Sequence, residues 1–367
     1  MNIFHRLDRV LLLCLLSLAV IGMTTLYGAV HAGDVSIWYK QGVYWLVGIA
    51  AFTVMCFIPI RMIGLLVWPV YLLALLMLIL VPFVGDVQMG ARRWINLGFA
   101  NIQPSELMKW ALVLLLAYWF AMREASSLKA FAAALLFVGV PAGLIVIQPD
   151  LGTALVLCLA ASAVILVAGF PWKWFLALVA ASPFALYVLW HNMLDYQKGR
   201  VLSFLNPELD PLGKGYHVIQ SSIAIGSGGI FGKGYLEGSQ SRLHFLPEQH
   251  TDFIFAVLAE EGGLIASSIL FLLYGILITR ILIIALRAHS RFAGLACVGI
   301  ASIFTLYVFV NIGMVSGMLP VVGVPLPFIS YGGSALLSML VALGLVMRVA
   351  IESNGQVSWQ RPSSPLS

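Results

Sequence analysis

Long apolar stretches separated by short polar breaks recur along the whole chain. A bilayer core needs about 20 apolar residues per helix, so the pattern predicts ten membrane-spanning helices, of which the eighth is long enough to tilt or extend past the membrane. It predicts an all-α, polytopic integral membrane protein with a long loop at about 191–252 between helices 7 and 8. The expected spans are 10–30, 42–60, 63–84, 104–121, 130–147, 151–169, 174–190, 253–283, 292–317 and 331–350.

The composition supports a membrane protein and excludes a water-soluble one. Hydrophobic residues make up 61% of the 367 positions and charged residues 10%, whereas soluble domains are about 45–50% apolar and about 25% charged. Because apolar segments recur throughout, we expect one membrane domain over 1–367. The apolar run from Val10 to about Val30 is too long for the core of a signal peptide, so we expect an uncleaved first helix.

The positions of Lys and Arg predict which side of the membrane each loop occupies. If the N-terminus is cytoplasmic, eleven of the 20 basic residues lie in inner segments and three in short outer loops. Inner loops normally carry the excess, so both termini are predicted to be cytoplasmic and the loop at about 191–252 external. The basic residues are scattered singly, so the net charge of +5 does not indicate a nucleic-acid partner.

Acidic residues gather at the predicted outer face. All but three of the 15 lie in outer loops or near outer helix ends, and carboxylates are costly at membrane depth unless they are paired or hydrated. Three helices that start at this face open with a proline followed by an acid, and the candidate acids at these helix starts are Glu106, Asp150 and Asp252. Proline and a carboxylate also suit a first helical turn. Each acid, Asp150 above all, is therefore either a helix cap or part of a functional site.

An ion pair is predicted inside the fourth helix. Lys109 follows Glu106 by three residues, which places both on one helix face. The pair is either functional or a structural pair that fixes one helix against another. Glu260 and Glu261 lie deeper in the eighth helix, where intramembrane acids mark functional sites or take hydrogen-bonded structural roles.

The outer loops supply cations. Arg92 and Arg93 precede Trp94, and Lys198 and Arg200 open the long loop. Arginine beside an aromatic ring suits a phosphate or pyrophosphate, although the same residue types also anchor helices at the membrane interface.

The glycine-rich segment 226–234 does not predict a nucleotide site. A phosphate-binding loop needs Gly where Ser227 stands and Ser or Thr where Gly234 stands. We expect flexible backbone close to a ligand or another helix. The apolar residues 216–225 before it are too short to span, and predict an interfacial or re-entrant segment.

The chain resembles the SEDS family of shape, elongation, division and sporulation proteins, and its elongation members most closely. The resemblance covers nearly the whole chain. It rests on five motifs in order: Gly-Ala-Arg-Arg-Trp at 90–94, Gln-Pro-Ser-Glu at 103–106 with Lys109, Gln-Pro-Asp-Leu-Gly-Thr at 148–153, the segment 247–261, and Pro-Leu-Pro-Phe-Ile-Ser-Tyr-Gly-Gly-Ser at 325–334.

The resemblance implies a peptidoglycan glycosyltransferase of the bacterial inner membrane that polymerises lipid II outside that membrane, among membrane lipids. It also implies a class B penicillin-binding protein as partner, within the elongation machinery. The residue matching Asp252 is the essential catalytic candidate in that family, those matching Glu106, Lys109 and Asp150 are functionally sensitive, and a divalent cation assists.

Glycan polymerisation requires a carboxylate that accepts a hydroxyl proton and cations that stabilise the departing pyrophosphate. We expect Asp252 to be the base and a possible metal ligand. The cations for the leaving group are expected among Arg92, Arg93, Lys109, Lys198 and Arg200, with Mg²⁺ or Mn²⁺ as a possible bridge. His250 and Ser330 lie in the shared motifs and are further substrate-binding candidates.

Two other functions fit some of these features. A transporter or flippase for the lipid-linked precursor would also use broken helices, buried ion pairs and a glycine-rich segment. No two segments show convincing inverted-repeat symmetry, however, and the acids crowd outward instead of marking a path across the membrane. A scaffold that only holds a synthase is the third possibility.

Overall fold

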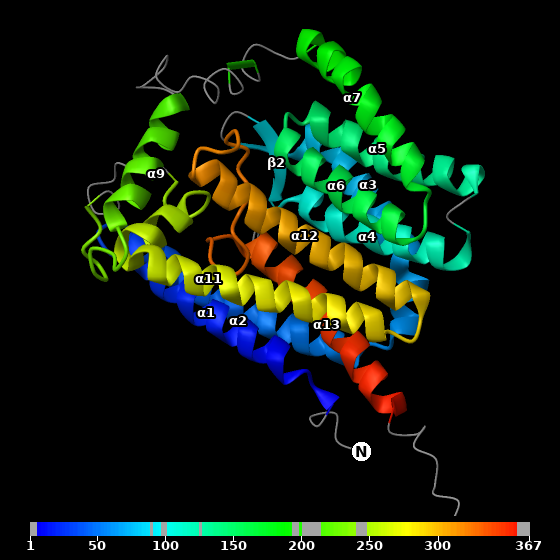
Figure 1. The fold of residues 1–367 in the computed structure, drawn as a ribbon, viewed down its shortest axis with the longest axis horizontal. Helices are drawn as coiled ribbons and strands as arrows, with labels where there is room; N and C mark the ends of the chain where they lie inside the picture. Colours follow the sequence, from blue (N-terminus) through cyan, green and yellow to red (C-terminus); the bar gives the residue numbers. More distant parts are fainter. Residues whose placement is uncertain are drawn as a thin grey trace, which may run out of the picture.

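The computed structural model describes residues 6–88, 91–96, 101–124, 127–192, 198–199, 214–239 and 248–357. These residues form a helical bundle with a small three-stranded sheet (Figure 1). Each of the ten predicted spans coincides with a helix, and α9 is a further helix in the described part of the chain. The helices are α1 (Arg9–Val30), α2 (Ser36–Phe57), α3 (Ile60–Val84), α4 (Pro104–Met122), α5 (Leu128–Ile147), α6 (Leu151–Val167), α7 (Trp172–Asn192), α9 (Lys214–Gly228), α11 (Ile254–Arg287), α12 (Arg291–Val315) and α13 (Gly333–Val357).

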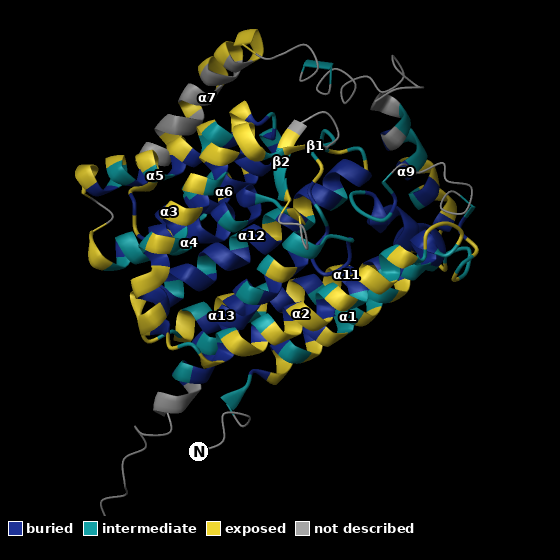
Figure 2. Cartoon of the chain, turned by 180° about the vertical axis from the view of Figure 1, so that it is seen from behind, coloured by how far each residue is buried: buried dark blue, intermediate teal, exposed yellow. Residues whose placement is uncertain are grey.

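The helices have the lengths and surfaces of membrane spans. Within the described residues, eight of them, α1 to α5 and α11 to α13, are long and apolar enough to cross a bilayer, while α6 is a shorter apolar helix of 17 residues. Large apolar side chains such as Leu46, Leu65 and Phe83 are exposed, and exposed residues line the outside of the bundle (Figure 2). Lipid, and not water, is the solvent that suits this surface. The predicted all-α polytopic membrane fold is confirmed.

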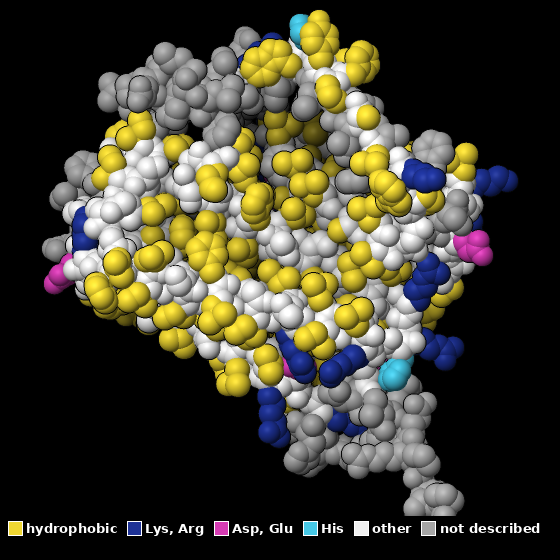
Figure 3. Space-filling model, in the orientation of Figure 1, with side chains coloured by type: hydrophobic (Ala, Val, Ile, Leu, Met, Phe, Trp, Pro, Cys, Tyr) yellow, Lys and Arg dark blue, Asp and Glu magenta, His cyan; other side chains and the backbone are white. Residues whose placement is uncertain are grey.

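Basic side chains surround the end of the bundle where α1 begins and α13 ends (Figure 3). Arg9 is the first residue of α1, Arg123 follows α4, Arg287 ends α11 and Arg291 begins α12. Asp8 caps α1 by accepting a hydrogen bond from the N–H of Leu11, and it pairs with Arg280 of α11 at 2.7 Å. α4, α6 and α11 begin at the opposite end, so the two ends differ in chemistry as the charge pattern predicts.

The start of α2 differs most from expectation, and the start of α11 bears directly on Asp252. α2 begins at Ser36, six residues before the predicted 42, because Gln41 is a buried residue within the helix and not part of a polar break. The segment 248–253 forms turns and α11 begins at Ile254. Residues 248–252 therefore precede the helix and do not form its first turn, and Asp252 lies at the end of the helix, next to the predicted start at 253.

A three-stranded antiparallel sheet, which the sequence pattern did not predict, occupies the connection between α3 and α4. Its strands are β1 (Asp86–Gln88), β2 (Ala91–Asn96) and β3 (Asn101–Ile102), in the order β1-β2-β3. Asp86 pairs with Trp94, and Ile95 pairs with Ile102. Arg92 and Arg93 therefore lie on a short strand, where their side chains point to opposite faces.

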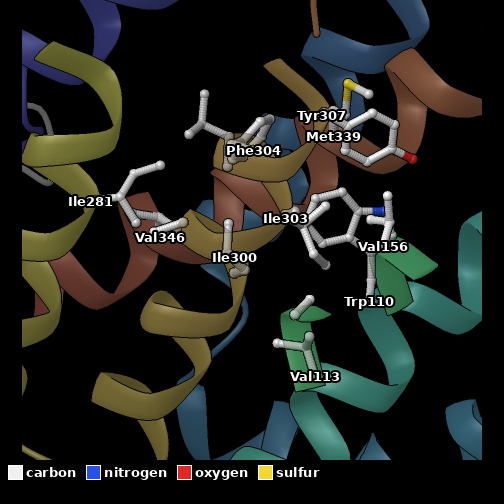
Figure 4. Close-up of a cluster of buried hydrophobic side chains, with 14 of the residues drawn as sticks. Trp110, Val113, Val156, Ile281, Ile300, Ile303, Phe304, Tyr307, Met339 and Val346 are labelled. Carbon is white, nitrogen blue, oxygen red and sulfur yellow. The ribbon is translucent and has the colours of Figure 1, made fainter. Parts of the chain in front are cut away.

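The interior of the bundle is formed mainly by α4, α12 and α13. In the apolar stretches of these three helices 67%, 67% and 72% of the residues are buried, whereas in the other five spans the buried share is 22–39%. Figure 4 shows the contact between α4 and α12, where Trp110 lies beside Phe304 with ring centroids 5.8 Å apart. Two of these three enclosed helices, α4 and α12, carry Glu106, Lys109 and Tyr307.

α11 is broken at Gly263, whose φ of 65° and ψ of −159° are not helical. The segment 226–234 packs against the break and replaces the missing helical hydrogen bonds. The N–H groups of Lys233 and Gly234 donate to the backbone carbonyls of Glu260 and Glu261. The N–H groups of Leu264 and Ile265 donate to the backbone carbonyls of Gly229 and Ile230. This confirms the expectation of glycine-rich backbone close to another helix. A Cβ on Gly232 would lie 2.0 Å from the Glu261 carbonyl oxygen, so only glycine fits there.

Candidate active site

The backbone that carries Asp252 is held by donors from two other segments. Residues 250–252 precede α11, so their carbonyl groups need partners outside that helix. Each of these three consecutive carbonyls accepts one hydrogen bond. The N–H of Tyr331 donates to the His250 carbonyl at 2.9 Å, and the Ser330 hydroxyl donates to the Thr251 carbonyl at 2.6 Å. The side-chain amide of Asn311 donates to the Asp252 carbonyl at 2.9 Å. The backbone of Asp252 is therefore fixed from α12 and from the segment that leads into α13.

The carboxylate of Asp252 is partly exposed and lies against Gly323. A Cβ built on Gly323 would be 3.3 Å from Oδ2 of Asp252, and Gly323 has a φ of +70°. The next residue, Val324, accepts a hydrogen bond at 2.7 Å from the same Asn311 amide that holds Asp252. Backbone without a side chain therefore borders one side of the carboxylate.

The predicted ion pair between Glu106 and Lys109 is present. The two charged atoms are 2.7 Å apart, and both side chains are more than nine-tenths buried. The hydroxyl of Tyr307 on α12 donates to the Glu106 carboxylate at 2.9 Å, and the Lys109 ammonium contacts the same hydroxyl and lies 4.4 Å from the ring centroid. This enclosed arrangement joins α4 to α12, as the structural alternative for the pair requires.

Asp150 has the geometry of a helix cap. Its carboxylate accepts hydrogen bonds from the N–H of Thr153 at 3.2 Å and from the Thr153 hydroxyl at 2.9 Å. The side-chain amide of Gln103, which precedes α4, also donates to it at 3.3 Å. Asp150 thus starts α6 and connects that start to α4.

The three acids converge on one end of the bundle. Tyr307, which binds Glu106, and Asn311, which holds Asp252, are one turn apart on α12. A Cβ on Gly152 of α6 would lie 2.7 Å from the Val322 side chain, and Val322 precedes the Gly323 that borders Asp252. Neighbouring contacts therefore connect the starts of α4, α6 and α11.

The two predicted arginines occupy different positions. Arg93 donates from Nε to the Gln148 carbonyl at 3.1 Å and from Nη2 to the Pro149 carbonyl, so it holds the turn between α5 and α6. Arg92 is exposed and donates to the carbonyl of Pro82 at 3.0 Å. Arg92 is thus accessible to a ligand, whereas two donors of Arg93 already bind backbone.

The remaining predicted substrate contacts differ in accessibility. His250 is partly buried, and its ring centroid lies 5.9 Å from that of Tyr331. Burial lowers the pKa of His250, and the nearby charge of Glu248 opposes that effect. Ser330 is buried, and its hydroxyl both donates to Thr251 and accepts from Leu326. Lys198 is partly buried in the short piece 198–199, and Arg200 lies outside the described residues.

The two deeper acids belong to the break in α11. Glu260 pairs with Lys233 at 2.7 Å and accepts from the hydroxyl of Ser239 at 3.1 Å. Glu261 is buried against α1, where a Cβ on Gly28 would lie 2.7 Å from its carboxylate. Glu260 thus takes the structural role that the sequence left open for it.

In the described part of the chain, no group of three or more His, Cys, Asp or Glu residues is placed to hold a metal ion. Magnesium commonly uses one or two carboxylates together with substrate phosphates and water. Asp252, a partly exposed carboxylate, fits that limited role.

The sequence analysis did not identify Tyr307 and Asn311 as site residues. Both are fully buried at the centre of the site. A tyrosine in an apolar helix gives no separate signal, because it packs like phenylalanine. Asn311 did give a signal in the sequence, since a lone amide inside a membrane helix is costly unless it is hydrogen-bonded.

The sequence matches a family model described as cell cycle protein, covering FtsW, RodA and SpoVE proteins, over residues 5–355. The chain belongs to the FtsW/RodA/SpoVE family. It is 44% identical to the peptidoglycan glycosyltransferase MrdB of Escherichia coli strain K12 over 94% of this chain and 93% of that protein. It is 42% identical to the stage V sporulation protein E of Bacillus subtilis over 75% of this chain and 76% of that protein.

Solved structures of family members have the same fold. A chain of a peptidoglycan synthase complex, studied for its coordination of polymerization and crosslinking, matches with a TM-score of 0.83 and 35% identity over 95% of this chain and 98% of that chain. The rod shape determining protein RodA of Thermus thermophilus matches with a TM-score of 0.72 and 32% identity over 94% of this chain and 96% of that chain. The resemblance to the SEDS family is confirmed.

Proposed function

We propose that this family member is a peptidoglycan glycosyltransferase that polymerises lipid II into glycan strands during cell elongation, with Asp252 as the general base. The observation that carries the proposal is the partly exposed carboxylate of Asp252 at one end of a membrane bundle, where Asn311 donates to the Asp252 carbonyl and Ser330 to the neighbouring Thr251 carbonyl. A base held in place before substrate binds needs little reorganisation during reaction. The match to MrdB over nearly the whole chain supports the same activity.

The reaction joins a sugar hydroxyl to the anomeric carbon of a second lipid-linked sugar. Asp252 accepts the hydroxyl proton as the new carbon–oxygen bond forms. The bond from the anomeric carbon to the pyrophosphate breaks, and its electron pair leaves with the phosphate oxygen. In a single displacement the anomeric configuration inverts.

The departing pyrophosphate needs positive charge, and the exposed guanidinium of Arg92 is the most accessible of the predicted cations with a described side chain. Lys109 is enclosed by Glu106 and Tyr307, so it acts by fixing α4 to α12. A divalent cation bound by Asp252 and the substrate's phosphates would supply further charge neutralisation.

The chain is a multi-pass membrane protein, and the proposed location is the bacterial inner membrane with both termini cytoplasmic. The basic ends of α1, α11 and α12 support this orientation, which places Asp252 at the external face. The proposed partner is a class B penicillin-binding protein, which crosslinks the strands. The fold shared with a chain of a peptidoglycan synthase complex supports that partnership.

A transporter is a weaker explanation of the broken helix. Discontinuous helices in transporters turn their free backbone groups toward a substrate. In α11 the carbonyls of Glu260 and Glu261 bind the N–H groups of Lys233 and Gly234, so the segment 226–234 fills the break.

The test uses the purified protein with its partner, labelled lipid II and a blocked transpeptidase. We expect glycan strands from the wild-type protein and from a complex whose partner lacks its active-site nucleophile, and none from Asp252→Ala. Strands formed at the wild-type rate by Asp252→Ala would refute the proposed mechanism. Movement of lipid II across a vesicle membrane without strand formation would favour the transporter.

A further inference from the structure

We infer that α12 is the positioning element of the site, with Asn311 as the residue that fixes Asp252 and Tyr307 as the residue that fixes α12 itself. The inference rests on the proposed function, since it assigns a role toward the proposed base. Neither side chain touches the reacting atoms of the proposed reaction, so both are positioning residues.

Asn311 is suited to this role because both hydrogens of its amide are used. Nδ2 donates to the carbonyl of Asp252 at 2.9 Å and to the carbonyl of Val324 at 2.7 Å. The first carbonyl belongs to the proposed base, and the second follows Gly323, which borders the carboxylate. One amide therefore sets the distance between the base and the backbone facing it.

The position of Asn311 is itself constrained. Its side chain is fully buried, and Oδ1 has no hydrogen-bond partner among the described residues. An unpaired buried oxygen is unfavourable, so the amide orientation is set by the two donor contacts and not by the acceptor. The site thus tolerates an unsatisfied oxygen to keep both carbonyls in place.

Tyr307 supplies the fixed reference for Asn311. It lies one turn earlier on α12, and its hydroxyl donates to Glu106 while the Lys109 ammonium lies over its ring. Since α4 and α12 are among the most buried helices, this polar contact sets the register between two helices otherwise joined by apolar side chains. α12 then carries that register to Asp252 through Asn311.

The test compares kcat and KM for lipid II polymerisation by the partner complex. Asn311→Leu removes both donors, and a small displacement of a catalytic group costs up to about 100-fold in rate. We expect kcat to fall at least about tenfold with KM within about threefold, and the acidic limb of the kcat–pH profile to shift because the base has moved. Asn311→Ser keeps a hydroxyl donor, so its kcat should lie between those of the wild-type protein and Asn311→Leu. This variant replaces Asn311→Leu in the test if the latter does not fold.

Tyr307→Phe keeps the ring beside Lys109 and removes the hydroxyl, which contacts both Glu106 and Lys109. We expect a smaller fall in kcat, about three- to tenfold, with KM unchanged. The matched control is Ser302→Ala, because the Ser302 hydroxyl binds only the Val298 carbonyl of its own helix. It should leave both constants at wild-type values.

Two outcomes overturn the inference. One is a kcat within about twofold of wild type for both Asn311 variants, and the other is a loss confined to KM or to the yield of folded protein, with an unchanged pH profile. If Asp252→Ala also polymerises normally, the proposed function fails as well. If Asp252→Ala is inactive and the Asn311 variants are normal, only the positioning role fails.

Discussion

At the scale of single residues, buried charge is the feature that most shapes this site. Glu106 and Lys109 are more than nine-tenths buried and lie 2.7 Å apart. Their spacing by three positions predicted the pair, because it puts both on one helix face. The sequence could not predict Tyr307 as the third member, since nothing in a chain of apolar residues shows which tyrosine faces a carboxylate on another helix.

Removing one charge of this pair should destabilise the protein more than removing both. Lys109→Met leaves the Glu106 carboxylate buried without its counter-ion, which costs about 3–5 kcal/mol. In Glu106→Gln/Lys109→Met neither charge remains, so we expect an apparent Tm closer to wild type. Thermal unfolding in detergent measures both.

Glu352→Gln is the control, because Glu352 forms a partly exposed pair with Arg348 and such pairs contribute about 0–1 kcal/mol. If the double variant unfolds at or below the temperature of the single variant, the pair does not act as a counter-ion pair.

His250 gives the site a dependence on pH. Burial lowers its pKa from the ordinary 6.5, so protons bind the unfolded chain more readily than the folded one. The stability that this residue contributes is complete above pH 6.5 and is lost as the pH falls below that value. We expect the apparent Tm of the wild-type protein to fall more steeply between pH 7 and 5.5 than that of His250→Asn. Equal slopes would show that burial of His250 does not affect stability.

At the scale of elements, the hydrophobic pattern predicted which segments are helices better than it predicted the sheet or the break within a helix. Ten apolar stretches gave ten helices because lipid requires each span to satisfy its own backbone. The small sheet at 86–102 was missed because its strands are short and polar. The break in α11 was also missed, since the apolar pattern resumes at Leu264 directly after Gly263 and only the backbone angles of Gly263 reveal the interruption.

The break should depend on glycine at one position and not at another. Gly263 has a φ of 65°, and a Cβ there would lie 2.3 Å from the N–H nitrogen of Gly232. We expect Gly263→Ala to lower stability by more than about 2 kcal/mol through strain and collision. Gly275→Ala, also in α11 but with open space around its Cβ, should be neutral or slightly stabilising. Thermal unfolding distinguishes them, and equal effects would mean that the break is not built on Gly263.

At the scale of the whole molecule, the two ends of the bundle carry different chemistry. Arginines lie where α1 begins and where α11 ends, whereas Glu106, Asp150 and Asp252 lie near the opposite helix starts. Counting charges along the sequence predicted this polarity. It could not predict that the acids converge, because convergence depends on α12 and on the close approach of Gly152 to Val322.

The membrane also determines what this end can do. A substrate with a lipid tail and a pyrophosphate places its polar head at the interface, and the proposed orientation puts the partly exposed Asp252 at the same level. In that orientation the exposed apolar faces of the helices hold the bundle in lipid, and the carboxylate of Asp252 meets the sugar at the membrane surface.

The most direct measurement is the turnover of lipid II by the partner complex carrying Asp252→Asn, with lipid II binding measured on the same sample. The substitution keeps the shape and removes the charge that accepts the proton. We expect lipid II binding within about threefold of wild type and a kcat reduced by at least about 100-fold, the lower range of general-base contributions. A kcat within twofold of wild type would contradict the role of Asp252 as the general base.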